Sequence, residues 1–102
     1  MNKNNLDIPK EKIAHFCKRY HILKLSLYGS VIRSDFRNDS DVDVLVEFQP
    51  ECIPGFIALS KMERELSVIF NKRKIDMRTP QDLSPYFRDE VLSMAEVQYA
   101  QA

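Results

Sequence analysis

Two carboxylates stand two residues apart at the start of an alternating segment, Asp41 and Asp43. Every second position of Val42–Val46 is valine, which is the period of a strand, so the valines face the core and both carboxylates project from the opposite face. Like charges on neighbouring positions of one face repel unless a cation lies between them, and Mg²⁺ prefers oxygen ligands. The pair therefore indicates a Mg²⁺ site. The alternative is a polar turn at 39–41 followed by a solvated sheet face.

A glycine followed by a serine closes the preceding alternating segment. Gly29 is one of only two glycines in the chain, and ten residues separate Ser30 from Asp41. Glycine permits close approach of a backbone, and exposed N–H groups at such a turn, together with a serine hydroxyl, can bind phosphate. Phosphate donors and Mg²⁺ carboxylates would then lie at adjacent strand ends.

Asp76 is the third carboxylate of interest, in a short alternating segment predicted as a strand over Lys74–Arg78. If that strand neighbours the first two, Asp76 can approach the Asp41 and Asp43 pair. There it would act as a general base for an attacking hydroxyl or as a bridge between two metal ions. The alternative is an ion pair with Lys74 or Arg78.

These residues carry a resemblance to a known family. The segment Leu27–Phe48, LYGSVIRSDFRNDSDVDVLVEF, resembles the signature of the minimal nucleotidyltransferases in the DNA polymerase β-like superfamily, which is Gly-Ser, ten residues, then Asp-x-Asp. Ile75–Met77 falls where that family places its third carboxylate, and the resemblance extends over about Leu25–Tyr99. The sequence departs from the family at Ile32 and Ser34, where alanine and glycine are frequent, so the turn after the Gly-Ser pair could differ in shape.

In particular, the chain is similar to the antitoxins of HEPN/MNT toxin–antitoxin pairs. The resemblance implies a minimal nucleotidyltransferase fold and an enzyme that uses ATP together with two Mg²⁺ ions. It would transfer AMP to a tyrosine of a cognate HEPN ribonuclease toxin, with which it would form a hetero-oligomer. Neither histidine of this chain lies in the ribonuclease motif of such toxins, so the toxin would be a separate chain.

The resemblance also assigns roles by position. The triphosphate would be held by Gly29 and Ser30, the metal ions by Asp41 and Asp43, and Asp76 would complete the catalytic and metal-binding carboxylates. Arg33 matches a frequent family arginine and would touch phosphate; its alternative role is a surface salt bridge with Asp35.

Two further functions remain open. The chain could neutralise a toxin by binding alone, with a vestigial nucleotide site, although three intact carboxylates weigh against this. It could also transfer a nucleotide to a small molecule. Only 26 residues follow Asp76, so we expect no second domain to hold a small acceptor or a long RNA.

The helices and strands that must position these residues are predicted from the spacing of hydrophobic residues along the chain. Asp7 and Pro9 indicate the start of a first helix. The segment 31–37 suits a short helix or an irregular turn, and residues 38–40 indicate a turn. Helices are predicted at Pro9–Tyr20, at Phe56–Phe70 and from Ser84-Pro85 onward. A 3.6-residue period places the apolar side chains of the second helix on one core-facing side, namely Phe56, Leu59, Met62, Leu66, Ile69 and Phe70, and the last helix carries Phe87, Val91, Leu92 and Ala95. Strands are predicted at Leu23–Tyr28, Asp41–Phe48, Lys74–Arg78 and Val97–Tyr99. The order predicts an α+β sheet domain, and the resemblance implies that its sheet is small and mixed and packs against helices.

The composition of the chain limits the kinds of protein that it can be. The chain has 102 residues, of which 44% are hydrophobic, and 15 basic residues balance 15 acidic ones. We therefore expect one globular domain over residues 1–102 that binds neither nucleic acid nor a membrane directly. No signal-like segment begins the sequence, so we expect a cytoplasmic protein with reduced Cys17 and Cys52. The spacing of these cysteines and of the two histidines does not support a metal site of their own.

Overall fold

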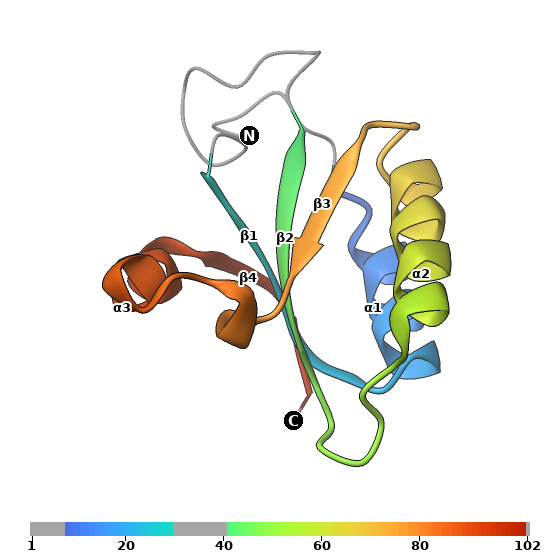
Figure 1. Ribbon diagram of the computed structural model, residues 1–102. Coiled ribbons are helices and arrows are strands. Elements are labelled where there is room, and N and C mark those ends of the chain that lie inside the picture. Colours follow the sequence, from blue (N-terminus) through green and yellow to red (C-terminus); the bar gives the residue numbers. More distant parts are fainter. Residues whose placement is uncertain (1–7, 30–40, 102) are drawn as a thin grey trace.

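The computed structural model describes residues 8–29 and 41–101, which form helices and strands in an α+β arrangement (Figure 1). The helices of this described part are α1 (Lys10–Arg19), α2 (Phe56–Ile69), the short 3₁₀ helix η2 (Pro80–Asp82) and α3 (Pro85–Met94). Its strands are β1 (Ile22–Tyr28), β2 (Val42–Phe48), β3 (Ile75–Arg78) and β4 (Glu96–Ala100). None of these helices has the length and apolar character needed to cross a membrane.

The strands of the described part form one mixed sheet in the order β3-β2-β1-β4. β1 is antiparallel to both β2 and β4, whereas β2 and β3 are parallel. Parallel neighbours need a crossover connection, which α2 supplies. Helices α1 and α2 lie on the same side of the sheet (Figure 1), and Glu63 of α2 accepts a hydrogen bond from the backbone N–H of Met77, which ties the edge strand β3 to that helix.

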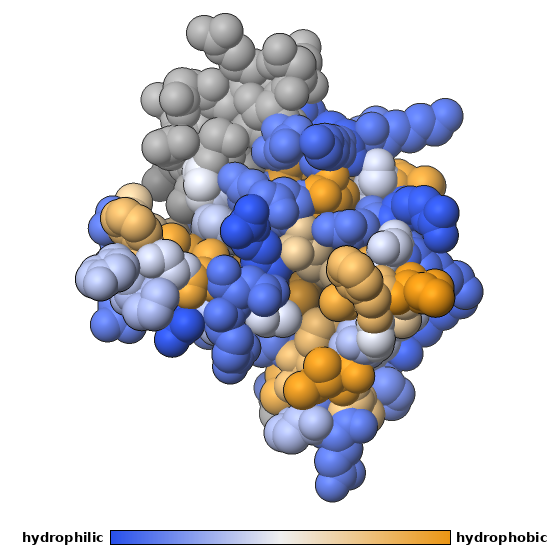
Figure 2. Space-filling model, in the orientation of Figure 1, coloured by the Kyte–Doolittle hydropathy of each residue, from blue (hydrophilic) through white to orange (hydrophobic). Residues whose placement is uncertain are grey.

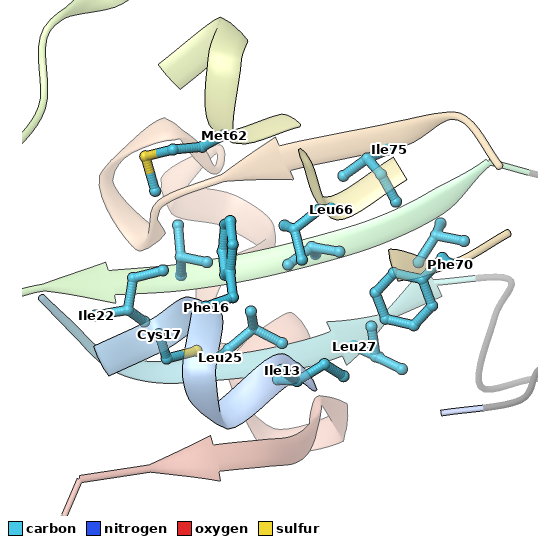
Figure 3. Packing of buried hydrophobic residues seen from close by; sticks show 13 residues of the cluster. Ile13, Phe16, Cys17, Ile22, Leu25, Leu27, Met62, Leu66, Phe70 and Ile75 are labelled. Atoms are coloured by element: carbon cyan, nitrogen blue, oxygen red, sulfur yellow. The ribbon is translucent and has the colours of Figure 1, made fainter. Parts of the chain in front are cut away.

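The core lies between the sheet and the helices α1 and α2 (Figure 3). One face of each inner strand supplies apolar side chains, and the helices supply the opposing layer. Buried members of this cluster include Ile13, Phe16, Cys17, Leu25, Leu27, Val42, Val44, Val46, Met62, Leu66, Phe70 and Ile75. Because side chains alternate along a strand, this packing turns Tyr28, Asp43 and Asp76 to the other face of the sheet.

The first helix and strand differ in detail from the sequence predictions. Pro9 stands at the N-cap of α1 rather than within its first turn, and Asp7 lies outside the described residues, as does the segment 30–40. In β1 the register against β2 shifts between Ile22 and Lys24. That irregularity buries Ile22 in the core and leaves Leu23 only half-buried, so the strict alternation predicted from Leu23 was wrong.

Apolar side chains of α3 and of the first turn of α2 are more exposed than their spacing predicted. Phe56 is 88% exposed because it begins α2, beyond the part of the helix that contacts the core. Helix α3 buries none of its residues, and Phe87 is 61% exposed. The predicted start of α3 is confirmed, since Ser84 caps it and Pro85 opens it, and the predicted terminal strand is present as β4.

The two cysteines differ in burial, which generates a chemical prediction. Cys17 is fully buried in the core, and this burial raises the pKa of its thiol to about 12. Cys52 is half-buried, and both thiols are free. The thiolate is the reactive form of cysteine. In mildly alkaline buffer we therefore expect iodoacetamide to modify Cys52 at least about tenfold faster than Cys17 in the native protein.

Mass spectrometry of the alkylated peptides measures both rates. The control is the protein unfolded in urea, in which the two cysteines should react at similar rates. Equal rates in the native protein would contradict the burial of Cys17.

Candidate active site

Three neighbouring strands bring Tyr28, Asp43 and Asp76 into a row. Asp43 is the register partner of Asp76 across the parallel pair β2 and β3, and it is also the partner of Tyr28 across the antiparallel pair β1 and β2. Neighbouring strands lie about 4.7–4.9 Å apart, so side chains at paired positions on one face are within reach of one another. The row lies on the face opposite the main core, near the end of the sheet where β1 finishes and β2 begins (Figure 1).

Gly29 follows β1 directly and packs closely against this row. Its φ of +74° is a left-handed conformation that residues with a Cβ rarely adopt. A Cβ added there would lie 2.3 Å from Oδ2 of Asp43 and 3.3 Å from its Cγ. The position therefore needs glycine both for its backbone conformation and for the space that the Asp43 carboxylate occupies.

Asp76 is paired with a basic residue of its own strand. Its Oδ1 accepts a hydrogen bond from Nε of Arg78 at 3.3 Å, with the two side chains 39% and 48% exposed. This hydrogen bond and the charge of Asp76 raise the pKa of Arg78. Of the two basic partners considered from the sequence, Arg78 forms the pair. Lys74 instead lines a hollow against α2, beside Ser67.

Tyr28 is a site residue that sequence reasoning missed. Burial, together with the negative charges of Asp43 and Asp76, raises the pKa of its phenol to about 12. The hydroxyl group therefore stays protonated beside the carboxylates and can donate a hydrogen bond. The alternation of β1 was a usable signal, because a buried Leu27 places Tyr28 on the face that Asp43 shares.

The remaining predicted residues stand differently in the structure. Asp41 is exposed and directly precedes β2, whereas Ser30 and Arg33 lie outside the described residues. In the part of the chain that is described, no three carboxylate, imidazole or thiol groups lie close enough together to hold a metal ion. Of the predicted set, the structure thus brings together Asp43, Asp76 and the backbone of Gly29.

The donor set at Asp43 and Asp76 fits a hard divalent cation. Both side chains offer carboxylate oxygens and are partly exposed, so substrate can reach them. Mg²⁺ is usually held by only one or two carboxylates and keeps waters and substrate phosphates as its other ligands. Two converging carboxylates beside an open surface therefore suffice for a Mg²⁺–phosphate complex.

A hollow of about 260 Å³ lies at the end of β3, between that strand and α2, and Arg78, the partner of Asp76, is one of its lining residues. It is bordered by apolar side chains, including Leu59 and Met77, and by the charged groups of Arg78 and Asp82. Asp82 is engaged locally, since its Oδ2 accepts hydrogen bonds from the backbone N–H and the hydroxyl of Thr79, both at 3.1 Å. An apolar recess with a polar rim suits a planar organic group.

Comparisons with known proteins found one family model and several relatives. The family model described as polymerase beta, nucleotidyltransferase, matches residues 11–101. A protein from Methanocaldococcus jannaschii, provisionally named protein adenylyltransferase MJ0435, is 28% identical over 91 residues, which cover 89% of this chain and 95% of that protein. Protein adenylyltransferase MntA from Thermococcus cleftensis is 30% identical over 56 residues, which cover 55% of this chain and 54% of that protein.

Solved structures share the fold. One described provisionally as a minimal nucleotidyltransferase superposes with a TM-score of 0.70 at 27% identity, covering 84% of this chain and 85% of that chain. A toxin–antitoxin crystal structure with AMP-PNP gives a TM-score of 0.73, covering 91% of this chain and 74% of that chain; at 16% identity this likeness shows the fold alone. The α+β fold with a mixed sheet, expected from the sequence, is confirmed.

The close contact at Gly29 generates a stability prediction. Gly29→Ala should lower the free energy of unfolding by at least roughly 1–2 kcal/mol, because alanine is strained at positive φ and its Cβ would displace the Asp43 carboxylate. The matched control is Gly55→Ala, whose added Cβ meets no atom within 4 Å. That variant should change the free energy of unfolding by less than about 1 kcal/mol, because the lower entropy of the unfolded chain and the weaker N-cap of α2 act in opposite directions. Urea denaturation followed by circular dichroism measures both, and a Gly29→Ala variant as stable as the control would contradict the contact.

Proposed function

Because the chain belongs to the polymerase β-type nucleotidyltransferase family, which the match over residues 11–101 shows, we propose that it transfers AMP from ATP to a hydroxyl group of a partner protein. The finer proposal is that this partner is a HEPN ribonuclease toxin, that the acceptor is a tyrosine, and that the transfer neutralises the toxin in the cytoplasm. Two relatives named as protein adenylyltransferases support the protein acceptor. A structural neighbour that is a toxin–antitoxin complex with AMP-PNP supports both the partner class and the nucleotide.

One observation carries the proposal: the register that sets Asp43 opposite Asp76 beside the tightly packed Gly29. Transfer of a nucleotidyl group needs a cation between carboxylates and phosphates, and a backbone close enough to meet the phosphates. Asp43, Asp76 and the backbone of Gly29 lie on neighbouring strands at one end of the sheet, which supports both roles in the proposal. The family motif supplies Ser30 and Arg33 as further phosphate contacts in the proposal, and Asp41 as the second carboxylate on the metal.

In the proposed reaction the acceptor hydroxyl attacks the α-phosphorus of ATP. A bond forms between that oxygen and phosphorus, the bond to the β-phosphate oxygen breaks, and pyrophosphate leaves. Bound Mg²⁺ would neutralise phosphate charge and lower the pKa of the attacking hydroxyl. Asp41 and Asp43 would hold the cation, and Gly29 and Ser30 would contact the triphosphate.

Asp76 has two possible roles, a ligand that completes the carboxylate set or the base that accepts the hydroxyl proton. In both roles its carboxylate must be available, and at 39% exposure it is accessible to substrate and solvent. Tyr28 lies opposite Asp43, and its raised pKa keeps its hydroxyl group protonated there.

Exposed apolar side chains support a protein as the acceptor. Ile53, Phe56 and Ile57 are 70%, 88% and 87% exposed around the start of α2, where Figure 2 shows hydrophobic side chains on the face that also displays β3. Grouped apolar side chains on a surface are typical of contacts with another protein. Phe56 and Arg78 border the same hollow, so a partner docked there would reach the end of β3 near Arg78.

The partner assignment is tested with the protein encoded by the adjacent gene. We expect that incubating this partner with the full chain, ATP and Mg²⁺ raises the partner's intact mass by whole AMP units and abolishes its ribonuclease activity. Omission of ATP, or addition of EDTA, should leave both mass and activity unchanged.

Loss of ribonuclease activity without a change in mass would favour neutralisation by binding alone. Modification of an aminoglycoside or similar small molecule without any protein partner would favour the small-molecule acceptor. Either result would contradict protein AMPylation.

The carboxylates are tested by charge removal. Asp43→Asn and Asp76→Asn should each lower the rate of AMP transfer by at least about 100-fold, since each removes negative charge from the site that must hold the cation. Glu11→Gln is the matched control, because Glu11 lies on α1 across the sheet, and it should leave the rate unchanged. Circular dichroism should show that all three variants are folded. Transfer at the wild-type rate by a folded Asp43→Asn variant would contradict the assignment.

A further inference from the structure

Arg78 places a positive charge on the face where the carboxylates lie. It is the last residue of β3, two positions after Asp76, so both side chains project from the same face of the sheet. Nε of Arg78 lies 3.3 Å from Oδ1 of Asp76. Arg78 and Asp76 therefore form an ion pair within one strand. The carboxylate of this pair is the one that the proposed reaction needs.

The surroundings of Arg78 are acidic. Besides Asp76, the carboxylate of Asp43 acts on the guanidinium electrostatically. Asp82 borders the same hollow as Arg78 but accepts hydrogen bonds from the backbone N–H and the hydroxyl of Thr79. Arg78 therefore faces the carboxylate row itself rather than a neighbouring acidic turn.

The guanidinium of Arg78 is itself a cation, and its position conflicts with the binding of a metal ion at Asp76. The oxygen that pairs with Arg78 belongs to the same carboxylate that would complete the divalent cation's ligand set. A guanidinium and a divalent cation repel each other at such short range. The pair also leaves both side chains partly exposed, so it is weak enough to exchange.

We infer that Arg78 competes with the divalent cation for Asp76 and thereby sets how much cation the enzyme needs. This inference rests on the proposed function, because it takes Asp76 as part of the cation site. Arg78 is a positioning residue in this role: it holds Asp76 while the cation is absent and releases it when the cation binds. Its neutral replacement should leave the carboxylate open and strengthen cation binding.

The test measures binding of Mn²⁺ to the full chain without nucleotide, by the loss of the free-ion electron paramagnetic resonance signal. For Arg78→Met we expect the dissociation constant of Mn²⁺ to fall about two- to fivefold at low ionic strength. A change of this magnitude corresponds to the interaction energy of one partly exposed ion pair. Arg78→Lys keeps the charge and should restore a value near wild type. Added salt should reduce the difference between Arg78→Met and wild type, because salt screens exposed charges.

Arg64→Met is the matched control, since it removes the same charge from an exposed position on α2. It should leave the dissociation constant unchanged. Arg78→Gln serves as a second neutral variant if the methionine variant does not fold. An unchanged or larger dissociation constant in a folded neutral variant would overturn the inference.

The two proposals fail differently. If wild-type protein binds Mn²⁺ and loses that binding in Asp43→Asn and Asp76→Asn, the cation site stands, and equal affinity in Arg78→Met then overturns only the competition. If wild-type protein shows no Mn²⁺ binding that depends on Asp43 or Asp76, the cation site fails and the competition fails with it. A raised KM for ATP in Arg78→Met, with unchanged Mn²⁺ binding, would assign Arg78 to the nucleotide and overturn the competition.

Discussion

The register of β2 against β3 is the constraint on which the candidate site depends. Val42 pairs with Ile75, and the next pair along the two strands is Asp43 with Asp76. A slip of one residue would turn either carboxylate toward the core, because the side chains of a strand alternate between its two faces. The buried valines of β2 and Ile75 of β3 oppose that slip. The apolar packing that stabilises the sheet therefore also fixes the distance between the two carboxylates.

Holding like charges together costs free energy, and the structure shows what offsets it. Both carboxylates are partly exposed, so solvent screens their repulsion. Arg78 neutralises part of the charge on Asp76, and Gly29 leaves the Asp43 carboxylate the space that a Cβ would fill. The chain has equal numbers of acidic and basic residues, yet this face presents a local cluster of carboxylates. A neutral composition thus coexists with a site suited to a cation and its phosphates.

Most of the fold follows from patterns within single segments, whereas the site depends on contacts between segments. The valines of β2 and the period of α2 indicate their elements directly, and the Gly-Ser and Asp-x-Asp spacing identifies Gly29, Asp43 and Asp76 as candidates. No pattern within one segment reveals that β2 and β3 are parallel, or that Tyr28 lies opposite Asp43, because both are cross-strand relations. Periodicity also assigned Phe56 to the core, since spacing alone does not show where along a helix its partners end.

The central claim is that this sheet face transfers a nucleotidyl group to a protein. It is tested most directly by supplying the full chain, Mg²⁺ and the partner encoded by the adjacent gene with ATP radiolabelled on either the α- or the γ-phosphorus. The proposed reaction predicts label on the partner from the α-labelled nucleotide alone, with the γ-label released in pyrophosphate. Label on the partner from the γ-labelled nucleotide, or no label from either, would contradict it.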